Sequence, residues 1–141
     1  MNATPTLSAL IAAPDGHLGN ALCTVVKTIP GLHVVGRSAS QVETLRDLAY
    51  YDPDLLLLDV DLNRSAGNTA LALVPFLTLV RDLVPKIRVI TLVDDLRQKQ
   101  LAWGAGVDQV ILKSGYDQPL RQAVEFVSAG SFRDLVASGV D

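Results

Sequence analysis

Four consecutive leucines that end on an aspartate constrain the fold of this chain more than any other feature. The segment reads Pro53-Asp54-Leu55-Leu56-Leu57-Leu58-Asp59. An apolar run of this length behind a turn signal is typical of a strand buried on both faces, as in a parallel sheet. In open α/β sheets, functional groups collect just beyond the carboxyl ends of the strands. Asp59 therefore stands where a functional carboxylate is expected.

Two later apolar runs also end on polar groups. The run Ile87–Thr91 ends on a hydroxyl, and the run Gln109–Lys113 ends on an amine. The carboxyl ends of parallel strands meet at one edge of the sheet, so the pattern predicts that Asp59, Thr91 and Lys113 lie close together. A carboxylate, a hydroxyl and an amine in one place are suited to handling a phosphoryl group.

Strand-like and helix-like segments alternate five times along the 141 residues. This alternation predicts a flavodoxin-like (βα)5 fold, a doubly wound parallel sheet in strand order 2-1-3-4-5 with right-handed crossovers. We expect residues 1–130 to form one domain and residues 131–141 to form a tail or the start of a linker. The expected strands are Leu7–Ala13, Leu32–Gly36, Asp54–Asp59, Ile87–Thr91 and Gln109–Leu112, and the expected helices are Leu18–Thr28, Ser40–Tyr50, Thr69–Val84, Leu96–Gly104 and Asp117–Ala129.

The composition of the chain argues against nucleic-acid binding, secretion and membrane insertion. The net charge of −3 and the pI of about 5.2 argue against a broad nucleic-acid-binding face. The single Cys23 rules out an internal disulfide. A signal peptide begins with positively charged residues, but this chain has no Lys or Arg before Lys27. The longest apolar stretch, Ala70–Val80, is too short to span a membrane. We expect a cytoplasmic protein without membrane or direct nucleic-acid contacts.

Four segments carry a similarity to a known family: Leu32–Gly36, Asp54–Asp59, Ala105–Asp108 and Ile111–Lys113. They resemble the receiver domains of bacterial two-component response regulators, in particular the LuxR/NarL-type helix-turn-helix subfamily. The resemblance implies that Asp59 accepts a phosphoryl group, that the Thr91 hydroxyl binds that group and changes rotamer, and that Lys113 neutralises it.

The resemblance also implies partners. They are a histidine kinase if the site still takes a phosphoryl group, an output domain or other protein partner, and a second copy in a homodimer. We do not expect an enzyme, because the sequence contains no nucleophile–base pair, glycine-rich phosphate loop or metal cluster.

The main departure from the family concerns magnesium. The family holds this ion with an adjacent acidic pair after the first strand and with the backbone carbonyl at the position of Asp61. Gapless alignment from Asp59 back puts Ala13 and Pro14 in place of the acidic pair, and Asp15 comes one residue late. Magnesium is usually held through one or two carboxylates plus waters. We therefore expect no magnesium site, or a weak one formed by Asp15, Asp59 and the Asp61 carbonyl.

The missing acidic pair leads to the hypothesis of an atypical receiver that signals without routine phosphorylation. In that state Lys113 pairs directly with Asp59. The last strand carries Val110 where the family usually has an aromatic residue that moves with Thr91. The alternative is a conventional magnesium-dependent receiver in which Asp15 is the only acidic helper.

The predicted helix Thr69–Val84 has almost no polar face before Arg81, and Pro75 is expected to kink or restart it. It is either pressed deep onto the sheet or carries an apolar patch for a partner or second copy. Trp103, in the following helix, is expected in the core.

An alternative from another class rests on Asp15-Gly16-His17-Leu18-Gly19, which resembles part of the Asp-x-His-x-x-Gly motif of cobalamin-binding domains with the same layout. In that family the histidine ligates cobalt from below. The glycine here is one residue early, because position 20 is Asn20. The chain also has Val93-Asp94-Asp95 where that family has a glycine pair.

Overall fold

The leucine run lies at the centre of a five-stranded parallel sheet. The structure is a computed structural model that describes the backbone of residues 6–66 and 69–140 and the side chains of residues 6–63 and 73–128. The strand order is β2-β1-β3-β4-β5, so the predicted fold and order are confirmed. The strands are β1 (Leu7–Ala12), β2 (Leu32–Ser38), β3 (Leu55–Asp59), β4 (Arg88–Val93) and β5 (Gln109–Leu112).

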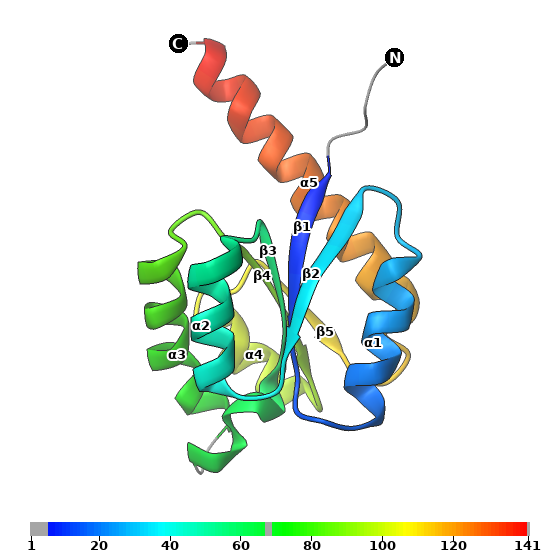
Figure 1. The fold of residues 1–141 in the computed structure, drawn as a ribbon, viewed down its shortest axis with the longest axis vertical. Helices are drawn as coiled ribbons and strands as arrows, with labels where there is room; N and C mark the ends of the chain where they lie inside the picture. Colours follow the sequence, from blue (N-terminus) through cyan, green and yellow to red (C-terminus); the bar gives the residue numbers. More distant parts are fainter. Residues whose placement is uncertain (1–5, 67–68, 141) are drawn as a thin grey trace.

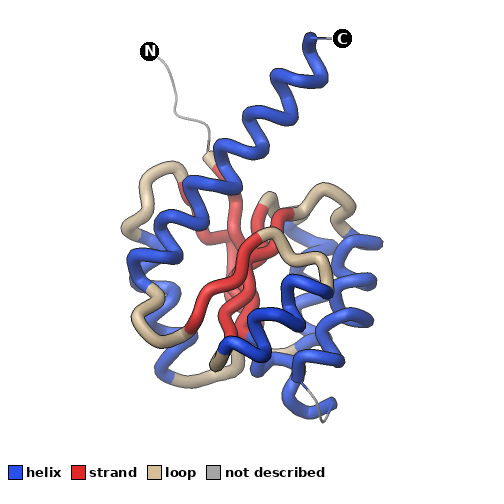
Figure 2. The backbone as a smooth tube through the Cα atoms, turned by 180° about the vertical axis from the view of Figure 1, so that it is seen from behind, coloured by secondary structure: helices blue, strands red, loops and turns tan. Residues whose placement is uncertain are grey.

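Helices cover both faces of the sheet, as Figure 1 shows. Helices α1 (His17–Lys27) and α5 (Asp117–Val140) lie on one face. Helices α2 (Gln41–Tyr51), α3 (Thr69–Leu83) and α4 (Leu96–Gly104) lie on the other, and the 3-10 segment η1 (Val60–Ala66) joins β3 to α3. Seen from behind in Figure 2, the strands form a central layer between the two helical layers.

Alternation along β3 explains why it is apolar throughout. Leu56 and Leu58 pack into the core on the α2–α4 side, and Leu55 and Leu57 pack into the core on the α1–α5 side. All four side chains are fully buried. Burial of a leucine side chain stabilises a fold by about 1.5–3 kcal/mol, so this strand is a major source of stability for both cores.

Helix α3 divides its apolar residues between the core and the surface. It continues through Pro75, so the expected restart there is wrong. Leu73, Phe76, Leu77 and Val80 are buried, whereas Val74, Leu79 and Leu83 are about half exposed. The helix therefore both packs onto the sheet and carries apolar surface, so each of the two expectations is partly met. The side chains of residues 69–72 lie outside the described residues.

Trp103 does not lie in the core, contrary to the expectation. Its exposed fraction is 44%, whereas the neighbouring Ala102 is fully buried. Successive residues of a helix point about 100° apart, and α4 turns the small side chain toward the sheet. The tryptophan ring therefore lies on the surface.

Helix α5 is longer than the sequence pattern predicted. It was expected to end near Ala129, but the backbone remains helical to Val140. In Figure 1 its last turns project past the amino-terminal edge of the sheet. The division into residues 1–130 and 131–141 remains a prediction, and Asp141 lies outside the described residues. No helix in the described part of the chain is both long and apolar enough to cross a membrane.

Asp108 fixes the start of β5 against β4. Its Oδ2 accepts a 2.7 Å hydrogen bond from the Val89 backbone N–H, and its own N–H donates to the Val89 carbonyl. Arg81 and Arg88 each lie 3.6 Å from its carboxylate. This carboxylate therefore holds together the end of α3, the β4 strand and the turn before β5.

We expect Asp108→Ala to lower the free energy of unfolding by about 1–3 kcal/mol, because it leaves the Val89 N–H without its acceptor. Urea denaturation measures the change. Asp82→Ala removes an exposed carboxylate from α3 and is expected to change stability by less than about 0.5 kcal/mol. An equal effect of both substitutions would contradict the assigned role of Asp108.

Candidate functional site

The ammonium group of Lys113 is the centre of the candidate site. Lys113 follows β5 directly, and its backbone N–H donates a 2.8 Å hydrogen bond to the Val93 carbonyl at the end of β4. Its Nζ lies 2.7 Å from Asp59 Oδ1, 2.8 Å from Asp61 Oδ2 and 3.2 Å from Asp94 Oδ1. Three carboxylates from two strand ends thus surround one lysine.

Asp59 is the most deeply buried of these carboxylates. It is the last residue of β3, and its exposed fraction is only 4%. Its Oδ1 accepts hydrogen bonds from Lys113 Nζ and, at 2.9 Å, from the Asp61 backbone N–H, where the chain turns into η1. A buried carboxylate needs such partners, because burial of an unpaired charge is costly. The predicted proximity of Asp59 and Lys113 is therefore present.

Lys113 stays protonated in this cluster. Among the described residues, its ammonium binds three carboxylates, and Asp61 makes a further interaction. Burial, the largest single effect, lowers the pKa of Lys113, but the contacts with Asp59, Asp61 and Asp94 together outweigh it and raise that pKa above its ordinary 10.5. The lysine is therefore charged at every physiological pH.

Thr91 does not lie at the strand tip, contrary to the expectation. Strand β4 continues for two residues to Val93, because Leu92 and Val93 are apolar and fully buried. Thr91 instead lies between Leu58 of β3 and Val110 of β5. Its hydroxyl is buried and has no hydrogen-bond partner among the described residues. The hydroxyl is thus one strand position inside the sheet from Asp59.

The residues around the expected magnesium site offer few oxygen ligands. Ala13 is fully buried and Pro14 partly buried, and neither side chain carries an oxygen. Asp15 is exposed in the turn before α1. Among the residues that the structure describes, no group of three His, Cys, Asp or Glu is placed to hold a metal ion. The side chains of Asp59 and Asp61 bind Lys113 instead.

Sequence reasoning missed the role of the Asp94 and Asp61 side chains. The sequence pattern predicts no site role for Asp94, and the family resemblance gives Asp61 a role only through its backbone carbonyl. The available signal was the apolar pair Leu92-Val93, which extends β4 and brings the next residue, Asp94, level with Lys113. The true polar tip of β4 is therefore Asp94.

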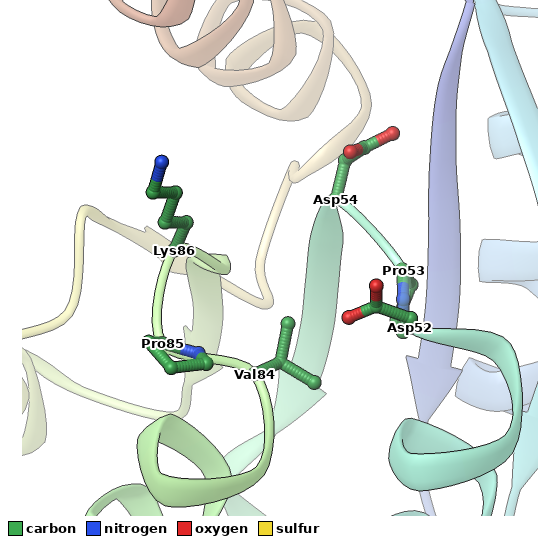
Figure 3. Close-up of a pocket in the computed structure, with 6 residues that line it drawn as sticks. All are labelled: Asp52, Pro53, Asp54, Val84, Pro85 and Lys86. Atoms are coloured by element: carbon green, nitrogen blue, oxygen red, sulfur yellow. The ribbon is translucent and has the colours of Figure 1, made fainter.

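A separate hollow lies at the opposite edge of the sheet. It has a volume of about 390 Å³ and is lined by Asp52, Pro53, Asp54, Val84, Pro85 and Lys86 (Figure 3). The Asp54 carboxylate accepts hydrogen bonds from the backbone and hydroxyl of Ser8, so it joins β1 to β3. These contacts are structural, and the hollow is remote from the Lys113 cluster because it lies at the amino ends of β3 and β4.

The chain is similar in sequence to a curated transcriptional regulatory protein and to a curated response regulator protein. The chain is 29% identical over 116 residues to the transcriptional regulatory protein CitT of Bacillus subtilis, covering 81% of this chain and 49% of that protein. It is 29% identical over 127 residues to the response regulator protein VraR of Staphylococcus aureus, covering 89% and 58%. The chain thus spans about half the length of the curated relatives it matches. No protein-family model matches it.

Solved structures share the fold. A LuxR-family two-component response regulator from Aurantimonas superposes with a TM-score of 0.73 at 20% identity, covering 89% of this chain and 86% of that one. The isolated REC domain of RcsB from Salmonella enterica serovar Typhimurium superposes with a TM-score of 0.74 at 16% identity, covering 89% and 90%. At these identities the likeness establishes the fold.

We expect Lys113→Met to lower the free energy of unfolding by about 3–5 kcal/mol, because it leaves Asp59 buried without its cation. The difference from the wild type is also expected to shrink at high pH. The folded-state pKa of Lys113 is raised, so its contribution is complete below the unfolded-state value near 10.5 and is lost as the pH rises through the folded-state value. Urea titrations between about pH 8 and about pH 11.5 measure both effects.

Lys86→Met, at an exposed lysine, is the matched control, with an expected change of less than about 0.5 kcal/mol at any of these pH values. If both lysine variants had the same stability, Lys113 would not be the centre of the cluster.

We expect Thr91→Val to leave stability unchanged or to raise it by up to about 1 kcal/mol, because it removes a buried hydroxyl without a described partner and keeps the shape of the side chain. Thr44→Val is the matched control. Thr44 is equally buried, but its hydroxyl donates a 2.7 Å hydrogen bond to the Ser40 carbonyl, so a loss of about 1 kcal/mol is expected. Thermal denaturation compares the two variants, and a larger loss for Thr91→Val would show that its hydroxyl is bonded in solution.

Proposed function

We propose that this chain, which has the receiver fold and response regulators as its sequence relatives, is a signalling domain of the receiver type that acts without routine phosphorylation. Signals then pass through protein–protein contacts. The observation that carries this proposal is that Ala13 and Pro14 stand where the family would place its magnesium-binding carboxylates.

The metal does not fit the residues present. Ala13 belongs to the apolar core between the sheet and helices α1 and α5, so its position is dry. Lys113 binds Asp59 Oδ1 and Asp61 Oδ2, so a divalent ion beside these carboxylates would lie close to the positive charge of its ammonium. Repulsion between the two cations would weaken binding of the divalent ion.

The charge of the cluster also opposes phosphoryl transfer. Catalysis of this reaction depends on positive charge that offsets the charge of the transferred group. Here the Lys113 ammonium already binds three carboxylates, so less of its positive charge is available to the transferred group. Asp59 is also 4% exposed, so it presents little surface to a donor. These features support weak phosphorylation or none.

The alternative is a conventional magnesium-dependent receiver that uses Asp15. This alternative is supported by the exposure of Asp15, which lies in the loop between β1 and α1 and can contact water and ions. The cobalamin alternative has no comparable support: His17 is the exposed first residue of α1, and its motif is imperfect.

The partners in this proposal are an output domain or other protein, a histidine kinase if the site is still phosphorylated, and a second copy of the chain. Helix α3 offers apolar surface for such contacts. Its half-exposed side chains are Val74, Leu79 and Leu83. The homodimer remains a prediction.

Beryllofluoride, which mimics a phosphoryl group on aspartate, tests the proposal. With magnesium added, we expect the amide resonances of residues near Asp59 and Thr91 to stay in place in a two-dimensional NMR spectrum. Large shifts at millimolar magnesium would overturn the proposal in favour of the conventional receiver.

A gain-of-function variant serves as the positive control. Ala13→Asp combined with Pro14→Asp restores an acidic pair, and we expect this variant to shift at Asp59 and Thr91 under the same conditions. Its circular dichroism spectrum checks that the fold survives a polar residue at the buried position 13. Acetyl phosphate followed by mass measurement of both proteins distinguishes binding of the mimic from covalent transfer.

A further inference from the structure

We propose that Asp94 is a positioning residue that holds the Lys113 ammonium in place and transmits its movement to the first turn of α4. The receiver-type function gives this contact its use, but the contact and its coupling to α4 do not depend on phosphorylation.

The Lys113 ammonium has no donor to spare. A lysine ammonium carries three N–H donors. Three carboxylate oxygens, from Asp59, Asp61 and Asp94, lie within 3.2 Å of its nitrogen. A further anion at Asp59, or any other ligand for the ammonium, therefore has to replace one of these partners. The three carboxylates of the cluster therefore compete with any incoming anion for the Lys113 ammonium.

Asp94 is the partner that is released most easily. Its contact, at 3.2 Å, is the longest of the three. The exposed fraction of its side chain is 44%, compared with 20% for Asp61 and 6% for Asp59. A carboxylate that leaves the ammonium must be hydrated, and only an exposed one is hydrated at little cost. When the Lys113 ammonium binds a new partner, Asp59 and Asp61 therefore keep their contacts with it and Asp94 is released.

Asp94 is also part of the amino-terminal cap of α4. Its backbone N–H donates a 2.7 Å hydrogen bond to Gln98 Oε1. The next residue, Asp95, caps the helix by accepting a 2.8 Å hydrogen bond from the Gln98 backbone N–H. The two bonds form a reciprocal cap in which Gln98 binds both aspartates. A shift of Asp94 is thus a shift within the cap of α4.

The relay that the family resemblance implies, from Thr91 to the last strand, lacks its aromatic ring. The family resemblance assigns the relay to a hydroxyl and an aromatic ring, but Thr91 here lies beside Val110. The Thr91 hydroxyl has no partner among the described residues. The contact between Lys113 and Asp94 provides a link that does not require an aromatic ring.

A pair of substitutions in two backgrounds tests the coupling. We expect Lys113→Met in the wild type to shift the amide NMR resonances of residues 95–98. We expect the same substitution in an Asp94→Asn background to leave these resonances where Asp94→Asn alone puts them. The Asp61 amide, which bonds Asp59, should shift in both backgrounds and so shows that the ammonium has been removed. Equal shifts at residues 95–98 in both backgrounds would refute the coupling.

A second measurement keeps the test valid if Lys113→Met does not fold. Exchange of the Lys113 ammonium protons with water, followed by NMR of the side-chain nitrogen, reports on its three contacts directly. We expect Asp94→Asn to accelerate this exchange several-fold, and Asp94→Glu to restore part of the protection. Asp82→Asn, at an exposed carboxylate of α3, is the control and should change nothing.

Unchanged exchange in Asp94→Asn would overturn the assigned role of Asp94. Neither measurement uses magnesium or a phosphoryl mimic, so either result is independent of the outcome with beryllofluoride. A failure here leaves the proposed receiver-type function intact, and the reverse also holds.

Discussion

The contact between one buried ammonium and three carboxylates organises the carboxyl edge of this molecule. Lys113 draws together the end of β3, the start of η1, the loop after β4 and the end of β5. Without that cation, Asp59 and Asp61 would repel each other in a poorly hydrated place. The path of the chain between β3 and α3 and the start of α4 both depend on this charge.

The same edge departs from the rules that govern the rest of the fold. The two cores are filled with aliphatic side chains, and β3, at the centre of the sheet, pairs without a register shift with β1 and β4. At the edge, three carboxylates share one ammonium, and just inside it a buried threonine hydroxyl has no partner among the described residues. Local violations of this kind are expected where function, rather than stability, has determined the residues.

Part of the candidate site was predictable from the sequence, because apolar runs that end on Asp59 and Lys113 mark neighbouring strand tips. The same reasoning ends β4 at Thr91, two residues too early, because the strand continues to Val93. The early strand end also hides Asp94, which receives no role at the site in the sequence analysis. Strand ends are defined by hydrogen bonds to neighbouring strands, here between Lys113 and Val93, which a single sequence does not display.

The sequence by itself determined the number and order of the elements, the parallel sheet and the identity of its central strand. These follow from hydrophobic periodicity, which is a local property of the chain. The tertiary structure alone decided that Asp61 and Asp94 share Lys113 with Asp59, that Trp103 lies at the surface and that α3 divides its apolar side chains between core and solvent. Contacts of this kind join residues up to 54 positions apart, and they depend on strand register and helix rotation, which only packing fixes.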